Sequence, residues 1–277
     1  MTLFRFAKAQ DRPRLREIWK RSFGDSEEYI DRFLDHFGVD SGIVGECDGE
    51  IVCSAYILPT AGLVLKDGSK RSCSYLYAIS VIPDYRGNGL GRDVTFAAVD
   101  FSYRLGNEFV VLKPSDDGLY DFYRSLGFIE LSYANEFVFT PEQLKHCSEK
   151  HLKILPISPE EYGIIRRKNL KGRTHIELSD IAVSYQHKLG ALYSLLHEGE
   201  KYCAAVEKNG SNLYIKELLV PSDLVVSAVS ALSAEMPASK YRVSVPVFDE
   251  KSAVRTGMIF PAEDYTADYP FLCLAYD

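Results

Sequence analysis

Residues 81–92 read Val-Ile-Pro-Asp-Tyr-Arg-Gly-Asn-Gly-Leu-Gly-Arg, and the interpretation of the whole chain depends on this stretch. Before it, residues 72–81 predict a strand, because apolar side chains recur at every second position and Pro83 has no N–H to continue the pairing. After it, an apolar stripe at helical spacing from Leu90 to Leu105 predicts a helix. Three glycines and two arginines therefore lie in a tight turn between a strand and a helix.

This context suits a phosphate group. The first N–H groups of a helix have no partner within the helix, and the helix dipole adds partial positive charge there. Glycines allow close approach of the backbone to a ligand, and Arg86 and Arg92 can add charge-assisted hydrogen bonds. The stretch matches neither a Walker A loop nor a Rossmann fingerprint. The alternative is a glycine-rich turn that binds nothing.

A second segment favours the phosphate interpretation. Residues 108–113 predict a short buried strand, and residues 119–128 read Leu-Tyr-Asp-Phe-Tyr-Arg-Ser-Leu-Gly-Phe, a short helix closed by glycine. Together with the glycine turn, this segment resembles the acetyl-CoA-binding core of the GCN5-related N-acetyltransferases, the GNAT family. The resemblance covers about residues 1–140. One departure is Asp116, which stands seven residues before Tyr123 where many members have asparagine.

The resemblance implies an α+β GNAT fold, with a mixed central sheet flanked by helices, and acetyl-CoA as cofactor. It implies that the pyrophosphate binds the turn, at Arg86, Gly87, Asn88, Gly89, Leu90, Gly91 and Arg92. It also implies that the backbone of Ile79, Ser80 and Val81 receives the thioester carbonyl.

Tyr123 matches the tyrosine that acts as general acid in the family and protonates the departing thiolate. The alternative role is a core aromatic, and Tyr120 is the local rival for the acid. The general base stays open among Glu27, Glu46, Asp84 and the carboxylate of Asp277.

The resemblance places the acceptor site beside a pair of helices predicted over residues 10–23 and 26–37. Their aromatic side chains are expected to belong to the core. His36, a lone histidine near a helix end, is expected to be structural or on the surface.

Composition narrows the classes of partner. The net charge is −7, from 32 basic and 39 acidic residues, and no basic block marks a nucleic-acid surface. The six cysteines are scattered without a C-x-x-C pair, so no metal site is expected. No apolar run is long enough to span a bilayer. We expect a cytoplasmic protein that acts on a small-molecule or peptide amine, with homo-oligomerisation left open.

The second half partly repeats the first. We place a boundary at residues 145–146, which gives a catalytic domain over 1–145 and a degenerate GNAT-like domain over 146–277. Residues 218–221 stand where residues 80–83 stand in the first half, but no glycine turn follows, so no second cofactor site is expected. We also predict a helix over 179–196 and a hairpin around residues 209–210.

The tandem order resembles the enhanced-intracellular-survival acetyltransferases and their shorter bacterial relatives. The chain is too short to add their sterol-carrier-like domain as well. The implied activity is an acetyl-CoA-dependent N-acyltransferase in which a primary amine attacks directly in a ternary complex. The alternatives are a non-catalytic acyl-CoA-binding or regulatory module and, less favoured by the acidic composition, an aminoacyl transferase that uses charged tRNA.

Overall fold

The computed structural model describes residues 2–145, 150–263, 265 and 268–272. The chain divides into two compact units. The first consists of Met1–Gly62, Arg71–Ile129 and Met258–Glu263, and the second of Leu63–Lys70, Glu130–Gly257 and Asp264–Asp277.

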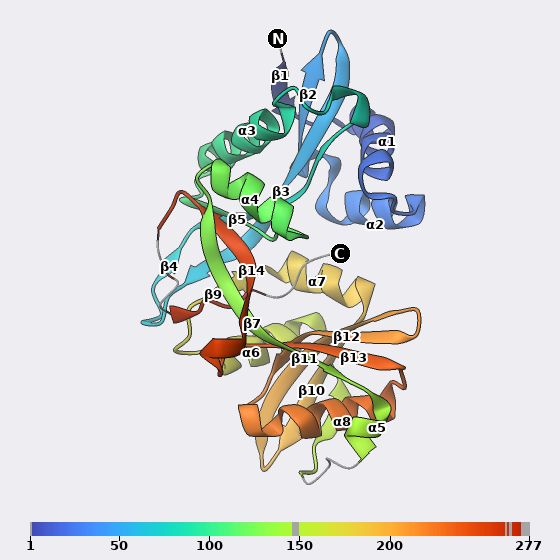
Figure 1. Ribbon diagram of the computed structural model, residues 1–277, viewed down its shortest axis with the longest axis vertical. Helices are drawn as coiled ribbons and strands as arrows, with labels where there is room; N and C mark the ends of the chain where they lie inside the picture. Colours follow the sequence, from blue (N-terminus) through green and yellow to red (C-terminus); the bar gives the residue numbers. More distant parts are fainter. Residues whose placement is uncertain (1, 146–149, 264, 266–267, 273–277) are drawn as a thin grey trace. The chain divides into compact units, whose positions relative to one another are not determined.

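The first unit is a mixed sheet with helices on both faces (Figure 1). Its strands run in the order β1 (Leu3–Phe6), β2 (Gly42–Cys47), β3 (Glu50–Val64), β5 (Cys73–Val81), β6 (Phe109–Leu112) and β14 (Ala253–Phe260). Neighbours are antiparallel except β5 and β6, which are parallel. The helices are α1 (Arg12–Phe23), α2 (Glu27–Phe37), α3 (Leu90–Arg104) and α4 (Asp117–Ser125), with short 3-10 turns at Ala9–Asp11, Val39–Ser41 and Pro83–Tyr85.

Alternating side chains of β5 serve the two faces. Tyr77 meets the ring of Trp19 from α1, with ring centroids 5.8 Å apart. Ser74 points the other way, and its hydroxyl lies 2.7 Å from that of Ser102 in α3. The pair α1–α2 and the helix α3 therefore cover opposite faces, as Figure 1 shows. The mixed sheet flanked by helices that we predicted is confirmed.

The second unit also has a mixed sheet. Its strand order is β7 (Ile129–Phe139), β13 (Lys240–Val245), β12 (Asn212–Leu219), β11 (Glu200–Asn209), β10 (Ala191–His197) and β8 (Lys153–Pro156), and only β12 and β13 are parallel among these neighbours. Two short strands, β4 (Lys70–Arg71) and β9 (His175–Leu178), lie off this path. The helices are α5 (Pro141–Lys145), α6 (Pro159–Asn169), α7 (Asp180–Leu189) and α8 (Val225–Glu235), with 3-10 turns at Ser222–Leu224 and Glu250–Ser252.

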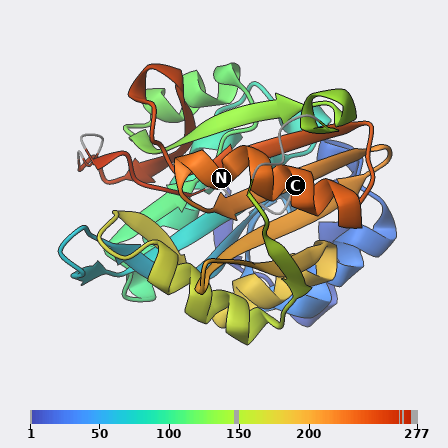
Figure 2. The ribbon, with the colours of Figure 1, turned by 90° about the horizontal axis from the view of Figure 1, so that it is seen from below.

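The two faces of this second sheet differ in chemistry. Helix α8, orange in Figure 2, packs apolar residues such as Val229 and Leu232 on one face. On the other face Arg166 of α6 makes a two-pronged hydrogen bond to Glu217 of β12, at 2.8 and 3.2 Å, and Tyr162 donates to the same carboxylate at 2.6 Å. All three are at most 1% exposed. The charge of Glu217 is thus compensated where water is excluded.

The compact units exchange strands along the sequence. Residues 130–139 of β7 belong to the second unit, where β7 pairs with β13 from Phe139↔Tyr241 to Asn135↔Val245. Met258–Phe260 of β14 belong to the first unit and pair with β6. Each unit is therefore completed by a strand from the opposite half of the chain. The predicted boundary at residues 145–146 assumes that each domain is one continuous stretch of sequence, and it stays a prediction.

Candidate active site

Strand β5 is bulged just before the segment predicted to receive the thioester. One residue of β3, Ala55, faces two residues of β5, Ala78 and Ile79, where the pairing register shifts. Ala78 has a φ of 47°, a left-handed conformation that is uncommon for a residue with a Cβ. A bulge increases the local twist and turns the residues after it away from the regular ladder.

Beyond the bulge, β5 extends past its parallel neighbour. The pairing of β5 with β6 ends at Tyr75↔Val111, whereas β5 continues to Val81. Among the described residues, peptide groups 76–81 therefore have no strand partner on that side. The Ser80 side chain is buried, with its hydroxyl 3.0 Å from that of Ser54, so it faces into the sheet. At Ser80 a carbonyl ligand could therefore meet only the backbone.

The glycine turn follows at the end of β5. Gly87 and Gly89 have φ values of 81° and 79°, which residues with a Cβ rarely adopt, and Gly89 is the N-cap of α3. The N-cap supplies no side-chain hydrogen bond, and the first bond of the helix runs from Asp93 N–H to the Gly89 carbonyl at 3.1 Å. The N–H groups of residues 90–92 are left at the open end of the helix. The predicted strand, glycine turn and helix are thus all present.

The side chains of the turn divide into two groups. Leu90 is 7% exposed and packs in the core, so only its N–H could meet a ligand. Arg86 and Arg92 are exposed. Arg86 Nε donates to the Val81 carbonyl at 2.9 Å, and Arg92 forms a 3.0 Å ion pair with Asp93. Both guanidiniums keep N–H groups that these bonds do not use.

Gly91 differs in backbone conformation from the other two glycines. It lies inside α3, and a Cβ built on it would lie 3.5 Å from the Phe122 ring of α4, which is an ordinary van der Waals distance. Alanine therefore fits at this position without a shift of α4. The assignment of Gly91 to the pyrophosphate turn stays a prediction.

Tyr123 lies in α4 with 7% of its surface exposed, between the rings of Phe122 and Phe128 at centroid distances of 5.1 and 5.6 Å. Its hydroxyl makes no hydrogen bond to any residue in the described part of the chain. Burial raises the pKa of Tyr123 above its ordinary value. The phenol is therefore protonated throughout the physiological range, as a proton donor must be.

Asp116, the departure from the family pattern, caps α4. Its carboxylate accepts the backbone N–H of Leu119 at 3.0 Å. Aspartate and asparagine are equally good N-caps, so the substitution preserves the start of the helix that carries Tyr123. Tyr120, one turn earlier on the same helix, is likewise buried, at 5% exposed.

The carboxylates considered as general base are engaged in ion pairs. Glu46 pairs with Arg5 at 3.3 Å, Asp84 with Arg21 at 2.8 Å, and Glu27 with Lys20 at 2.8 Å. The hydrogen bond from Lys20 lowers the pKa of Glu27. The lowered pKa makes Glu27 a weaker base, and all three carboxylates are already paired with a cation, so these contacts select none of the three. The remaining candidate, Asp277, lies outside the described residues.

An aromatic cluster lies where α1 and α2 meet the sheet. Trp19 is 2% exposed, and its ring centroid lies 4.8 Å from that of Phe33 and 5.3 Å from that of Tyr56. The Tyr29 and Tyr77 hydroxyls lie 3.2 Å apart. The Tyr56 hydroxyl is buried and has no hydrogen-bond partner in the described part of the chain. Trp19, Phe33 and Phe37 are buried, as predicted, whereas Phe23 at the end of α1 is 48% exposed, so the prediction is wrong there. The cluster also carries polar groups that a purely apolar core would lack.

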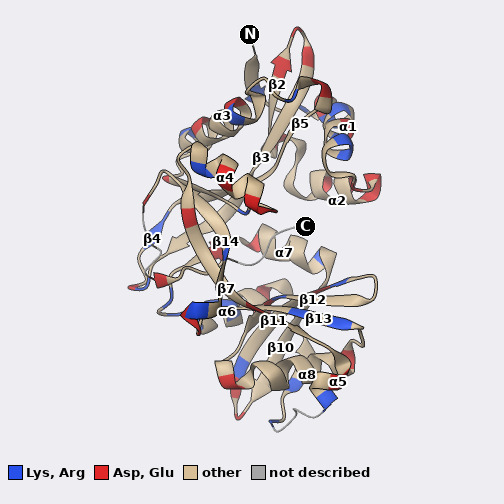
Figure 3. Cartoon of the chain, viewed as in Figure 1, with Lys and Arg blue, Asp and Glu red and all other residues tan. Residues whose placement is uncertain are grey.

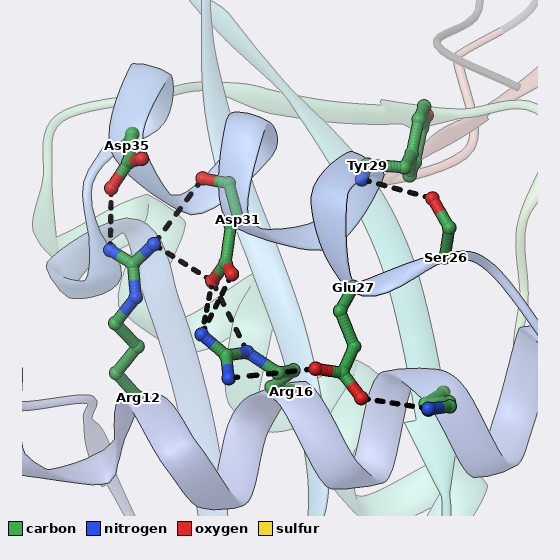
Figure 4. Close-up of polar contacts among 8 residues, drawn as sticks. Arg12, Arg16, Ser26, Glu27, Tyr29, Asp31 and Asp35 are labelled. Atoms are coloured by element: carbon green, nitrogen blue, oxygen red, sulfur yellow. Dashed lines mark hydrogen bonds and ion pairs between the residues drawn. The ribbon is translucent and has the colours of Figure 1, made fainter.

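Opposite charges join these two helices. In Figure 3, most of the charged residues of α1 are basic, and most of those of α2 are acidic. Figure 4 shows Arg12 and Arg16 of α1 both reaching Asp31 of α2, at 2.9 and 2.7 Å, while Arg12 also reaches Asp35 at 2.6 Å. The sequence carries the signal for this pairing, as one basic and one acidic helical segment in succession.

Metal-ligating clusters and membrane-spanning helices are both absent from the described part of the chain. No group of three or more His, Cys, Asp or Glu side chains there could hold a metal ion. No helix there is long and apolar enough to cross a membrane.

Comparison with known proteins agrees with this geometry. Residues 4–130 match the family model described as the acetyltransferase (GNAT) domain. A search of curated proteins found no significant match. A GCN5-related N-acetyltransferase structure from Anabaena variabilis superposes with a TM-score of 0.73 at 15% identity, over 94% of this chain and 72% of that one. A GCN5-related N-acetyltransferase structure from Kribbella flavida superposes with a TM-score of 0.71 at 15% identity, over 94% of this chain and 71% of that one. The structure of Eis1 from Mycobacterium abscessus superposes with a TM-score of 0.63 at 12% identity, over 94% of this chain and 73% of that one. At these identities the structural matches establish a shared fold.

Proposed function

From the membership of residues 4–130 in the GNAT acetyltransferase family, we propose that this protein transfers an acetyl group from acetyl-CoA to a primary amine. The observation that carries the proposal is the position of the family match. It contains the bulged strand β5, the uncapped glycine turn and the helix that bears Tyr123. Members of this family carry out acyl transfer. For this chain we propose acetyl-CoA as the donor and a primary amine as the acceptor.

The proposed binding of acetyl-CoA uses the turn at residues 86–92. The N–H groups at the start of α3 would donate hydrogen bonds to the pyrophosphate oxygens, and Arg86 and Arg92 would add positive charge from either side of the glycines. The backbone of residues 79–81, beyond the last pair with β6, would donate to the thioester carbonyl. The residues present suit such a ligand because nothing caps this helix.

The proposed chemistry is a direct attack. The neutral amine nitrogen bonds to the thioester carbon, the carbon–sulfur bond breaks, and the amine loses a proton to solvent or to a base that is not assigned. The leaving thiolate takes a proton from the Tyr123 hydroxyl. Burial disfavours the charged phenolate of Tyr123 and would equally disfavour a charged thiolate. Burial alone therefore does not widen the difference between the pKa values of the phenol and the thiol.

The proposal is tested by incubating the full chain with acetyl-CoA and a panel of polyamine, aminoglycoside, lysine and peptide N-terminal acceptors. Amine-dependent release of free thiol, with the acetylated amine seen by mass spectrometry, is expected for at least one class. Blanks without amine correct for the protein's own thiols. If CoA binds but no acceptor yields product, the non-catalytic acyl-CoA-binding module is the better description.

A further inference from the structure

The second unit contains a pocket of about 400 Å³ where its parallel strands separate. Strands β12 and β13 pair up to Ile215↔Val243, and β12 then continues to Leu219. The pocket lies at this end, lined by Leu219 and Val220 after β12 and by Pro246 after β13. This is the same place in the strand order that the extension of β5 beyond β6 occupies in the first unit. The volume falls within the usual range for small-molecule sites, ~300–1,000 Å³.

The pocket cannot cradle a pyrophosphate as the first unit is proposed to do. After β12 the chain runs through Pro221 into the 3-10 turn Ser222–Leu224 and directly into α8, with Leu224 as N-cap. No glycine lies in this stretch and none of its residues has a positive φ, so it lacks the two left-handed steps found at Gly87 and Gly89. The pocket therefore has the separation of the strands without the anion-binding turn.

The charges in the pocket lining are unbalanced. Lys168 is paired with Glu200, with Nζ 2.6 Å from Oε2. Arg173 lines the same pocket, and its one hydrogen bond among the described residues runs from Nη1 to the Val247 carbonyl at 3.1 Å. No carboxylate of a described residue pairs with it. Two cations and one carboxylate leave the lining with a charge of +1.

An unpaired, half-buried guanidinium is costly, because it loses hydration without gaining a counter-ion. Burial accordingly lowers the pKa of Arg173. A guanidinium has five N–H donors in a fork that fits a carboxylate, and the Val247 carbonyl uses one of them. The rest of the lining is mainly apolar or aromatic: Tyr202, Leu219, Val220, Pro221, Pro246 and Phe248.

We propose that this pocket binds a small organic monoanion, whose carboxylate pairs with Arg173 and whose apolar body packs against Leu219, Pro246 and Phe248. A single negative charge matches the +1 lining. A phosphate dianion would leave one charge uncompensated close to Glu200. The site is separate from the proposed acetyl-CoA site and is independent of the activity proposed for it.

The experiment measures binding of 2-naphthoate by calorimetry to the full chain saturated with CoA, with neutral 2-naphthylmethanol as the matched probe. Naphthoate should bind more tightly than the alcohol. The variant Arg173→Gln should weaken naphthoate by about tenfold or more, as the loss of a charge-assisted bond implies, and leave the alcohol unchanged. The control Lys171→Gln removes an equal charge two residues away at an exposed position outside the pocket, and should have no effect.

A second variant keeps the test decisive if Arg173→Gln does not fold. Ser222→Asp adds a carboxylate at the exposed rim of the pocket and should weaken naphthoate selectively. The proposal is overturned if naphthoate fails to bind the wild-type chain. It is equally overturned if the folded Arg173 and Ser222 variants bind naphthoate as the Lys171 variant does.

Discussion

At the scale of single residues, the hydroxyl of Tyr123 separates catalysis from packing. Tyr123→Phe keeps the ring between Phe122 and Phe128, and this hydroxyl bonds no described residue, so stability should change by less than about 1 kcal/mol. If the hydroxyl protonates the thiolate, kcat should fall by ~10²–10⁴-fold with CoA affinity nearly unchanged. Steady-state kinetics with an acceptor identified by the proposed panel measure kcat, and calorimetry with CoA measures the affinity.

Tyr120→Phe is the matched control, because Tyr120 is also buried and lies one turn earlier on α4. A wild-type rate for Tyr123→Phe with a crippled Tyr120→Phe would move the acid role to Tyr120. Wild-type rates for both would remove the general acid from the proposed mechanism.

Asp11 offers a pH-dependent test of stability. It is 6% exposed and accepts two hydrogen bonds from Arg5, at 2.6 and 3.2 Å, and one from the Lys8 N–H at 2.7 Å. The hydrogen bond from Arg5 is the main cause that lowers the pKa of Asp11. Its stabilisation is therefore complete above the unfolded-state pKa of ~3.9 and is lost as the pH falls through the lower folded-state value.

We expect Asp11→Asn to cost about 1.5–3 kcal/mol at pH 7, with the difference from wild type shrinking below pH ~4. Urea unfolding at a series of pH values measures this difference. Glu50→Gln, at an exposed position, should change stability little at any pH. A cost for Asp11→Asn that stays constant down to pH 2 would contradict the ionic origin of the effect.

The sequence could not predict whether a site residue presents its side chain or only its backbone to a ligand. Leu90 and Ser80 were predicted as cofactor contacts, yet both side chains are buried, so only their backbone groups could serve. Two of the candidate bases, Glu46 and Asp84, are ion-paired with arginines 41 and 63 residues earlier in the chain, and Glu27 is paired with Lys20 of the preceding helix. Such pairs depend on tertiary contacts, which local spacing does not encode.

At the scale of elements, the glycine turn permits a test of conformation against ligand contact. Gly89 and Gly49 have φ values of 79° and 86°, but Gly49 lies in the β2–β3 hairpin. Replacing either by alanine should cost about 1–2 kcal/mol of stability, because each forces a Cβ into the left-handed region. Only Gly89→Ala should weaken CoA binding. Equal CoA affinities in the two folded variants would remove the turn from the proposed cofactor site.

The elements predicted best were those bounded by glycine or proline residues. The glycine turn and the hairpin at residues 209–210 have the predicted positions, because glycines and proline set the backbone there. The helix predicted over 179–196 is wrong. Helix α7 ends at Leu189 and residues 191–197 form β10, since a Cβ at Gly190 would overlap the Val206 carbonyl oxygen as the chain enters the sheet. The bulge at Ala78 was also missed, because alanine carries no signal for a positive φ.

At the scale of the whole molecule, the exchange of β7 and β14 limits what a sequential reading can predict. A local sequence pattern can mark β7 and β14 as strands. It could not assign their partners, since β14 pairs with a strand almost 150 residues earlier in the chain. Removing residues after 250 should therefore disrupt the first unit as well as the second.

The number of CoA molecules bound per chain tests how the two units differ. Both contain a parallel strand pair in which one strand outruns the other, β5 over β6 and β12 over β13. Only the first is followed by a glycine turn and an uncapped helix, whereas residues 222–224 lead straight into α8. Because the turn supplies the proposed phosphate contacts, calorimetry should give one CoA per chain.

The same titration on Gly89→Val completes the argument. Valine at this position combines a strained left-handed backbone with a side chain at the start of α3, so binding should disappear altogether rather than fall to a residual second site. Circular dichroism and thermal unfolding would establish that the variant is folded. Two equal sites in the wild-type chain would show that the separated strands of the second unit bind CoA without a glycine turn. One undiminished site in folded Gly89→Val would instead remove the turn from the proposed cofactor site.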